Sequence, residues 1–456
     1  MYLTLRDRPL RERRSGIRER VAATVILLGI VSMFTDMATE SVNAILPKYL
    51  IVNLGLSFQA FGFVNGLYSG ISAIIRILGG WISDRTDHPK WVAFLGYAAS
   101  ALARVGLLFA SGLTAISTII TADRLGKGLR TAPRDALIAA ASTPQSLGRA
   151  YGVHRSLDSV GAAIGPLIAF WILTVAENDF HSVFVASSAL SVVGLAVLLL
   201  IVPDLRPRRT RAANDSVTAG TAKTSAGATK TRKADHPDHP DRSAPEPAVS
   251  AGKPGKVTLT HLANPDMGRL LLAAGLLGVL TVGDAFLYLQ LQLRDNLANN
   301  YYALLMVGMN AAYLCLAIPL GRLADRIGRA RIFIGGHIAL LGCYLCAAGP
   351  FAGPAMSIGT LILLGTYYAA TDGTLAALSG RIVDPDVRTS GIATAQTFMA
   401  IAGFASSLIV GILWARLGLS TAILWYCPVL VVAIPAAAII LLKLDRSSGA
   451  RVGATA

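Results

Sequence analysis

The chain of 456 residues is 54% hydrophobic and only 15% charged, with a mean hydropathy of +0.57. A soluble domain of this length carries more charge, so the composition excludes an ordinary soluble protein and indicates a membrane protein. The net charge of +15 does not indicate a nucleic-acid surface, because the basic residues are spread over alternate connections and both termini.

Twelve apolar runs are long enough to cross a bilayer core of about 30 Å, which takes about 20 helical residues. Internal charges weaken the runs near 114–139 and 149–175, yet twelve spans fit the pattern better than ten or eleven. The sequence therefore predicts an all-α membrane protein with twelve transmembrane helices. They lie near 22–46, 57–81, 91–112, 114–139, 149–175, 181–202, 267–293, 300–321, 331–350, 355–380, 389–414 and 420–443.

The distribution of basic residues predicts the orientation of the spans. Seven arginines precede residue 21, and Arg149, Arg329 and Arg331 lie on connections of the same side. The positive-inside rule therefore predicts that both termini and the long middle connection are cytoplasmic, in the inner (plasma) membrane. The first apolar run is long and shows no small-residue cleavage pattern, so we expect it to stay in the protein as a span.

The middle connection separates two groups of six spans. Its composition shifts to Ala, Thr, Lys, Asp and Pro, with a repeated Asp-His-Pro, and buries too little apolar surface to fold. Weak metal or partner binding by the His-Pro repeats stays open, and the tail is also expected to lack regular structure. We predict a basic segment over 1–21, six-helix bundles over 22–202 and 267–443, a disordered linker over 203–266 and a tail over 444–456.

The two halves repeat each other. Residues 80–85 read GWISDR and residues 321–326 read GRLADR, each shortly before the next apolar run. Each half also places one acid in its first span, Asp36 and Asp284, after a Leu-Gly pair. A duplicated bundle can enclose a central cavity and rock around it, which is the usual solution for alternating access.

Acids within the predicted spans are candidates for proton coupling. Each costs about 2.5–3.5 kcal/mol on insertion scales, so it must face the bundle interior, water or a partner. Asp36 and Glu40 lie one helical turn apart on one face, where their repulsion favours binding of a proton. The alternative is a structural ion pair with a basic residue. We assign proton coupling to Asp36, Glu40, Asp158 and Asp284.

The fourth span carries a basic stripe. Asp123, Lys127, Arg130 and Arg134 follow at helical steps, and Arg124 lies on an adjoining line. Such a stripe needs water, substrate or the acids of the first and fifth spans, with which it would form a buried charge network. Alternatively, Arg130 and Arg134 lie at the cytoplasmic mouth and snorkel.

The fifth span carries two titratable residues and a predicted hinge. His154, Asp158, Gly161 and Gly165 share one stripe, and Pro166 follows directly. Glycines four residues apart permit close helix contact, and proline favours a bend, so we predict a hinge at Gly161, Gly165 and Pro166. His154 either relays protons with Asp158 or is a structural histidine satisfied by its neighbour.

Arg104, halfway along the third span, has no partner within its own helix. It is a candidate for binding an anionic group of a substrate, or for pairing with an acid of the network. The predicted substrate cavity contains Arg104, Asp123, Arg124, Lys127, Arg130, His154 and Asp372.

Enzyme chemistry is not indicated. The sequence has no phosphate-binding Gly-Lys-Ser/Thr loop and no zinc-protease histidine pair, so we expect no catalytic residues, no cofactor and no metal site. All four cysteines lie in predicted spans as small packing residues, although the CxxC spacing of Cys343 and Cys346 leaves metal or redox chemistry as an alternative.

Nearly the whole chain outside the linker and termini resembles the major facilitator superfamily. Residues 80–90 resemble its signature loop between spans two and three, and residues 321–331 are the second copy. Residues 124–128 resemble its Arg-x-x-x-Gly element, although Lys127 stands where many members have glutamine. Residues 161–166 resemble the fifth-span motif of the drug:proton antiporter branch.

The resemblance implies two pseudo-symmetric six-helix bundles and a gate at the cytoplasmic side. Asp87-His88-Pro89 departs from the pattern, in which glycine and basic residues are commoner, so this gate is expected to depend more on Arg85 and Lys90. The gate is assigned to Gly80, Asp84, Arg85, Lys90, Arg134, Asp135, Gly321, Asp325, Arg326 and Arg329.

These features together predict a secondary transporter that works as a monomer in the lipid bilayer. The preferred hypothesis is proton-coupled export of a small amphipathic or anionic compound, with substrate and proton competing for one charge network. Two alternatives stay open. One is a proton-coupled importer of an organic anion or metal chelate, and the other is a non-transporting receptor or scaffold that signals through residues 203–266.

Overall fold

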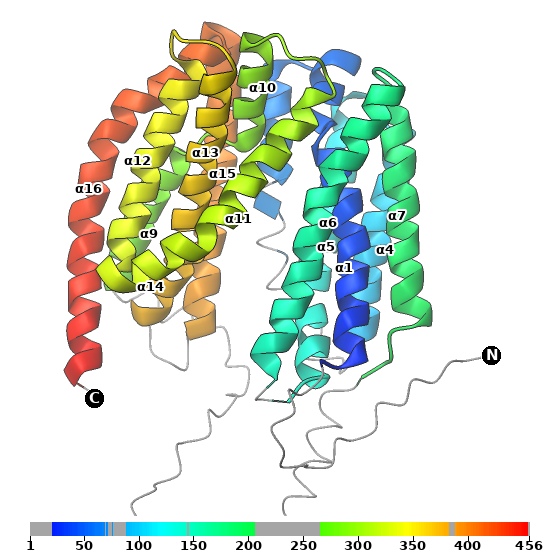
Figure 1. The fold of residues 1–456 in the computed structure, drawn as a ribbon, viewed down its shortest axis with the longest axis horizontal. Helices are drawn as coiled ribbons and strands as arrows, with labels where there is room; N and C mark the ends of the chain where they lie inside the picture. The colour runs from blue at the N-terminus through cyan, green and yellow to red at the C-terminus, as the bar shows by residue number, and fades with distance from the viewer. Residues whose placement is uncertain are drawn as a thin grey trace, which may run out of the picture.

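The computed structural model is a bundle of helices, in agreement with the predicted all-α class (Figure 1). The first gate motif at 80–85, the basic segment before residue 21 and most of the predicted linker lie outside the described residues. The described residues are 21–68, 70–71, 75, 88–143, 146–205, 265–382 and 388–454.

Helices of the first half follow the predicted spans closely. α1 packs against α6 and α7, and α4 packs against α5 and α7. The second predicted span is described in part, as helical residues 58–68 with 70–71 and 75. The other elements are α1 (Ala23–Asn43), α2 (Leu46–Lys48), the π-helical turn η1 (Tyr49–Asn53), α4 (Pro89–Leu107), α5 (Gly112–Ala140), α6 (Leu147–Val175) and α7 (Phe180–Leu200).

The second half contains two predicted spans that are broken in the middle. The run near 267–293 becomes two helices separated by residues 280–283, and the run near 355–380 divides at Asp372 and Gly373, whose φ is +76°. Hydropathy counts apolar residues and does not register such breaks. The elements are α9 (Pro265–Val279), α10 (Asp284–Arg294), α11 (Tyr301–Ile327), α12 (Arg329–Ala348), α13 (Pro354–Thr371), α14 (Thr374–Ile382), α15 (Arg388–Leu417) and α16 (Leu419–Ala454).

The last helix is longer than predicted. α16 continues to Ala454, whereas the sequence analysis ended the span at residue 443 and expected the tail to lack regular structure. That expectation is wrong for residues 444–454. Leu444, one residue beyond the predicted end, is still buried against the bundle, and the helix propagates from there.

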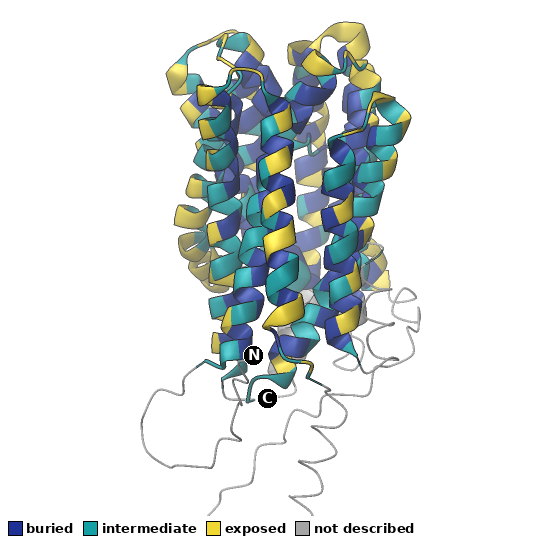
Figure 2. Cartoon of the chain, turned by 90° about the vertical axis from the view of Figure 1, so that its right-hand side faces the viewer, coloured by how far each residue is buried: buried dark blue, intermediate teal, exposed yellow. Residues whose placement is uncertain are grey.

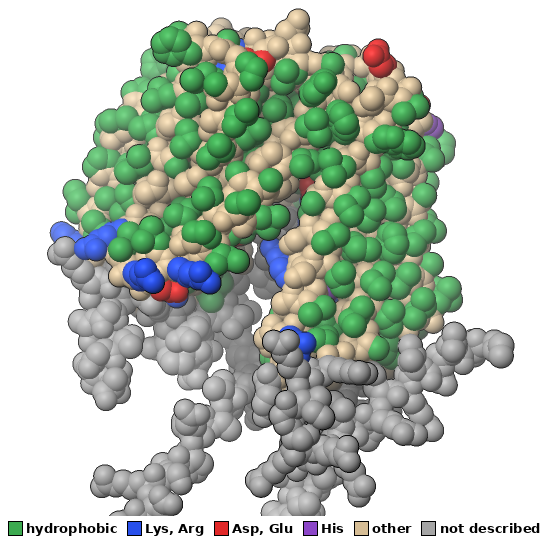
Figure 3. Space-filling model, viewed as in Figure 1, with side chains coloured by type: hydrophobic (Ala, Val, Ile, Leu, Met, Phe, Trp, Pro, Cys, Tyr) green, Lys and Arg blue, Asp and Glu red, His purple; other side chains and the backbone are tan. Residues whose placement is uncertain are grey.

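The outer surface of the bundle matches a lipid environment. Leu102, Trp171 and Val432 are each at least two-thirds exposed. Exposed positions follow the outer sides of the helices (Figure 2), and hydrophobic side chains are spread over the visible face (Figure 3). Nine of the described helical segments are long and apolar enough to cross a membrane. α4 and α5 are not among them, and α5 carries the charges that weakened the predicted run near 114–139.

The two halves lie side by side, joined at one end and separated by a hollow at the other (Figures 1 and 3). We call the joined end the far end, because α1 begins and α16 ends at the opposite, terminal end (Figure 1). α6 contacts α11 across the halves. Beside this contact, Asn299 donates to Asn178 at 2.6 Å and Asn300 donates to Thr174 at 3.1 Å.

Close backbone packing completes the closure of the far end. A Cβ on Gly62 would lie 2.6 Å from the carbonyl oxygen of Ser407 and 3.0 Å from Cα of Gly411. One turn away, Phe58 stacks on Trp414 with ring centroids 4.0 Å apart. Only glycine permits an approach this tight, so helix 58–68 and α15 fit together without a gap.

The connection after α10 is held by a charged pair outside the spans. Arg294 Nε donates to Asp295 at 2.9 Å, and Asp295 also accepts from Ser357 and from the backbone N–H of Gly353. The hydrogen bond from Arg294 holds the pKa of Asp295 below its usual range. This pair fixes the far ends of α10 and α13 to each other.

We expect Gly62→Val to open the far end, because the added side chain has no room against Ser407 and Gly411. Spin labels at Glu177 and Ala298, on a background without native cysteines, should report a longer distance in double electron–electron resonance. Gly403→Ala is the matched control, since a Cβ there meets nothing within 4 Å. An unchanged distance in Gly62→Val would contradict this account of the closure.

Candidate functional site

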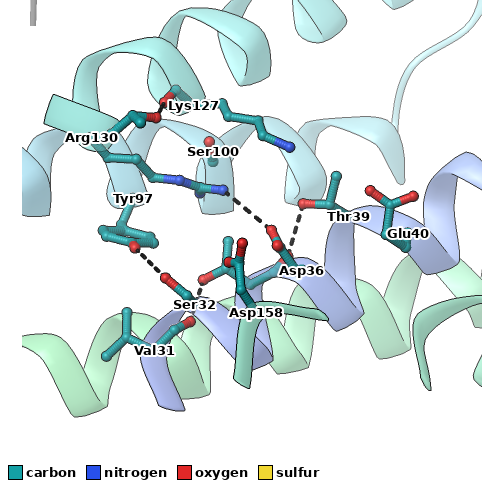
Figure 4. A network of polar contacts seen from close by, with 12 residues as sticks. Val31, Ser32, Asp36, Thr39, Glu40, Tyr97, Ser100, Lys127, Arg130 and Asp158 are labelled. Carbon is teal, nitrogen blue, oxygen red and sulfur yellow. Dashed lines mark hydrogen bonds and ion pairs between the residues drawn. The ribbon is translucent and has the colours of Figure 1, made fainter. Parts of the chain in front are cut away.

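A pair of acids lies at the interface of α1 and α6. The side chains of Asp36 and Asp158 lie next to each other in Figure 4. Two neighbouring carboxylates repel each other when both are ionised, so this placement favours binding of a proton by one of them. Arg130 Nη2 lies 4.0 Å from Asp36 Oδ1 and Arg134 Nη1 lies 4.0 Å from Asp158 Oδ1.

Glycines on α6 bring the acid pair together. A Cβ on Gly165 would lie 2.7 Å from the carbonyl oxygen of Met37, and Gly161 lies equally tightly against Met33. The predicted close contact at these two positions is therefore made with α1. Pro166 lies inside α6, which continues unbroken from Leu147 to Val175.

A second cluster surrounds Asp123. Arg104 Nη2 lies 3.4 Å from Asp123 Oδ1 and also donates to Thr39, while Arg124 forms a second pair with the same carboxylate. Both arginines are almost fully buried. Of the two hypotheses for Arg104, the structure therefore shows pairing with an acid. The guanidinium of Arg124 also stacks on the ring of Tyr68, 3.7 Å from its centroid.

Two further basic residues of α5, Arg130 and Arg134, have partners within the bundle. Arg130 is buried, faces Asp36 and lies over the ring of Tyr97, 4.5 Å from its centroid (Figure 4). Arg134 pairs with Asp135 at 3.1 Å and donates to Ser32 at 3.3 Å. Both side chains are held by partners within the first half, which contradicts the alternative of a solvated cytoplasmic mouth.

His154 follows neither hypothesis made for it. The side chain is buried, and neither ring nitrogen has a hydrogen-bond partner in the described part of the chain. The helical spacing correctly places His154 one turn from Asp158, but the imidazole does not bond to that carboxylate. Spacing along a helix fixes which face a side chain occupies, and it does not fix where the side chain reaches.

A cavity of about 360 Å³ lies between the halves, near the far end. Its walls carry one acid from each half, Glu40 of α1 and Asp284 of α10. Glu40 Oε2 accepts from Asn43 at 2.9 Å, and Asp284 accepts a hydrogen bond from the hydroxyl of Tyr368. The rest of the lining is aromatic, amide and aliphatic, so two carboxylates face a small and mostly uncharged space.

The break in the seventh span delivers Asp284 to this cavity. The hydroxyl of Tyr344 donates to the carbonyl of Leu280 at 2.9 Å and accepts from the N–H of Val282 at 2.7 Å. Ser406 donates to the carbonyl of Thr281 at 2.7 Å. These bonds satisfy backbone groups that leave the helix, so the break is stable and Asp284 begins α10.

The structure distributes the predicted cavity residues over different places. Arg104, Asp123 and Arg124 line a small void of about 20 Å³, which shares Tyr68 with the central cavity. Lys127, Arg130 and His154 lie outside the central lining. Asp372 is exposed at the end of α13, where it accepts from Tyr313 at 3.0 Å, so the structure does not bring it to the cavity.

Sequence analysis missed most residues that line the cavity, chiefly Asn43, Tyr68, Tyr288, Tyr302 and Tyr368. One signal was available, because Tyr288 follows Asp284 by one helical turn and shares its face. The other lining residues come from helices whose relative rotation the sequence does not give.

The described residues of the predicted gate pair within their own halves. Lys90 donates to the carbonyls of Leu199 and Val202 at 3.2 and 2.6 Å, and so joins α4 to α7. Asp325 lies 3.4 Å from Arg329. Gly321 and Arg326 are exposed on the part of α11 nearest the terminal end. Gly80, Asp84 and Arg85 lie outside the described residues.

Comparison with known proteins gives consistent matches. A family model described as Major Facilitator Superfamily matches residues 28–297 and 271–455. An MFS-type transporter of Methanocaldococcus jannaschii is 24% identical over 91% of this chain and 94% of its own length. The multidrug resistance protein MdtH of Edwardsiella ictaluri is 30% identical over 41% of this chain and 44% of its own length.

Solved structures with a similar fold include two transporters. The nucleoside transporter NupG has a TM-score of 0.70 at 14% identity and covers 92% of this chain and 99% of its own. The peptide transporter POT in complex with sulfate has a TM-score of 0.69 at 14% identity and covers 94% of this chain and 95% of its own.

Removing the shared carboxylate of the second cluster should strongly destabilise the first half. In Asp123→Asn, Arg104 and Arg124 both lose their ion pair while staying buried, which should cost about 3–5 kcal/mol of unfolding free energy. Adding Arg104→Met should recover part of the loss. Denaturant unfolding in detergent micelles measures both effects.

The control for this cycle is Asp266→Asn, because Asp266 pairs with the largely exposed Arg269 at 3.0 Å. Exposed pairs contribute little, so the change in stability should be small. If the losses of unfolding free energy from Asp123→Asn and Arg104→Met simply add in the double variant, the two side chains do not stabilise each other.

Proposed function

Because this chain belongs to the Major Facilitator Superfamily and is a multi-pass membrane transporter, we propose that it exports a small amphipathic compound in exchange for protons. One observation carries the proposal. Half-buried carboxylates from both halves line a cavity that is closed at the far end, while a hollow separates the halves at the terminal end (Figure 3). The multidrug resistance name of the partial relative MdtH supports export.

Both termini and the hollow are assigned to the cytoplasmic side. Arginines gather at the terminal ends of α11 and α12, where Arg322, Arg326, Arg329 and Arg331 lie in or beside one short connection. Short cytoplasmic connections carry such an excess of basic residues. The structure is then the inward-facing state, in which substrate enters the cavity from the cytoplasm.

The proton is assigned to the pair of Asp36 and Asp158. With one shared proton the pair carries a single negative charge opposite Arg130 and Arg134, and release of the proton adds a second charge to a buried interface. Asp36 lies one turn from Glu40 on α1, so the added negative charge changes the electrostatic potential at Glu40 in the cavity wall. Protonation thereby biases which of two states, open inward or open outward, is more stable.

The outward-facing state requires the opposite set of contacts. The far-end contacts of Asn178 with Asn299 and of Gly62 with Gly411 open, and the terminal ends of the halves close. Asp325 and Arg326 are exposed in the described part of the chain, so they are available to pair across the halves when the terminal end closes. Charges that are hydrated in one state and paired in the other keep the two free energies similar.

Asp158→Asn should uncouple transport from the proton gradient, because an amide of the same size can donate a hydrogen bond to Asp36 but does not titrate. In proteoliposomes, accumulation driven by a pH gradient should fall by about tenfold or more, while substrate exchange without a gradient persists. Asp266→Asn should behave as the unchanged protein. Full gradient-driven accumulation in Asp158→Asn would remove the proton role of this pair.

Export predicts the direction of flux. In inside-out vesicles that are energised to an acidic lumen, substrate should accumulate, and it should leak out again when the gradient is collapsed. Right-side-out vesicles should extrude it. Accumulation in right-side-out vesicles instead would establish proton-coupled import on the same scaffold.

A further inference from the structure

We propose that the central cavity recognises an organic monocation, consisting of a one-ring apolar body and a protonated amine held between Glu40 and Asp284. The proposal rests on the transport function above and adds the charge of the cargo. It replaces the anionic compound that the basic stripe of the fourth span indicated.

The charged side chains in the cavity wall are both acids. Glu40 and Asp284 come from opposite halves, and no lysine or arginine lines the cavity among the residues that the structure describes. A carboxylate away from bulk water is stabilised by an opposite charge. A cation bound between the halves supplies that charge to both.

The arginines are engaged elsewhere in the first half. Arg104 and Arg124 share Asp123, Arg130 faces Asp36, and Arg134 pairs with Asp135. An anionic substrate in the central cavity would have to compete with these carboxylates for a guanidinium. It would also lie beside Glu40 and Asp284, so like-charge repulsion disfavours it.

The number of charges follows from Lys127. Its ammonium on α5 extends toward the turn of α1 that carries Asp36 and Glu40 (Figure 4), where it offsets about one negative charge. Asp284 has a hydrogen bond from Tyr368 and no ion pair among the described residues. One net negative charge is left at the cavity, which fits a monocation better than a dication.

The remaining lining fits an aromatic amine. Tyr68, Tyr302 and Tyr368 line the cavity, and aromatic walls suit a cation or a ring, although Arg124 covers one face of Tyr68. Tyr288 also lines it, is only 2% exposed, and its hydroxyl has no hydrogen-bond partner in the described chain. Buried hydroxyls are normally paired, so this one points to a ligand group that is absent here. The volume of about 360 Å³ is at the small end for ligand pockets.

Three probes with one phenyl ring test the charge directly, using titration calorimetry on the full-length protein in detergent. They are 2-phenylethylammonium, the neutral 2-phenylethanol and the anionic 3-phenylpropanoate. The ammonium should bind at least about tenfold more tightly than the other two. Glu40→Gln and Asp284→Asn should each weaken ammonium binding by about tenfold, since each removes a charged hydrogen-bond partner.

Matched controls separate charge from folding. Glu177→Gln and Asp266→Asn, both outside the cavity, should keep the Kd of the unchanged protein. Asp284→Glu should keep most of the affinity for the ammonium probe, because it retains the carboxylate. This variant tests the site if Asp284→Asn fails to fold. The proposal would be overturned if the three probes bound equally, if the carboxylate bound more tightly, or if the ammonium did not bind. It would also be overturned if ammonium binding survived both neutralising substitutions.

These outcomes are distinguishable from failure of the export proposal. Ammonium binding without flux in vesicles would leave the cation site standing and remove export. Preference for 3-phenylpropanoate together with gradient-driven export would leave the export proposal standing and remove the cation site.

Discussion

The cost of ionised side chains inside a bilayer is the constraint on which this structure depends. Each charge there needs a counter-charge, a proton or water. Asp123 meets the constraint with two arginines, and Asp36 meets it with Arg130. These demands fix the faces that α1, α5 and α6 turn toward one another, because a carboxylate aimed at lipid would have none of these partners.

The two halves use their shared pattern differently. Asp36 and Asp284 are the corresponding acids of the repeat, yet Asp36 lies between helices of its own half while Asp284 faces the central cavity. The break at residues 280–283 causes the difference, because it ends α9 and starts α10 at the acid. Tyr344 and Ser406 satisfy the freed backbone, so a sequence repeat produces an asymmetric pair of sites.

The interactions inside each half are stronger than those that hold the two halves together. The charge clusters are buried and would be costly to break, whereas the far end is held by glycine packing, one ring stack and exposed amide hydrogen bonds. Exposed hydrogen bonds contribute little net free energy. The contact between the halves at the far end is therefore weaker than the interior of each half.

The sequence alone determined the helical spans, because apolar runs of bilayer length have one stable arrangement in lipid. It also determined that Asp36 and Asp158 need partners, and that Gly161 and Gly165 allow a close helix approach, since composition and helical period carry that information. Only the tertiary structure decided that Arg104 pairs with Asp123 and that Asp372 lies outside the cavity. It also decided that neither ring nitrogen of His154 has a hydrogen-bond partner among the described residues. Those outcomes depend on the rotation and offset of helices distant in the chain. The spacing of residues within one helix does not encode these quantities.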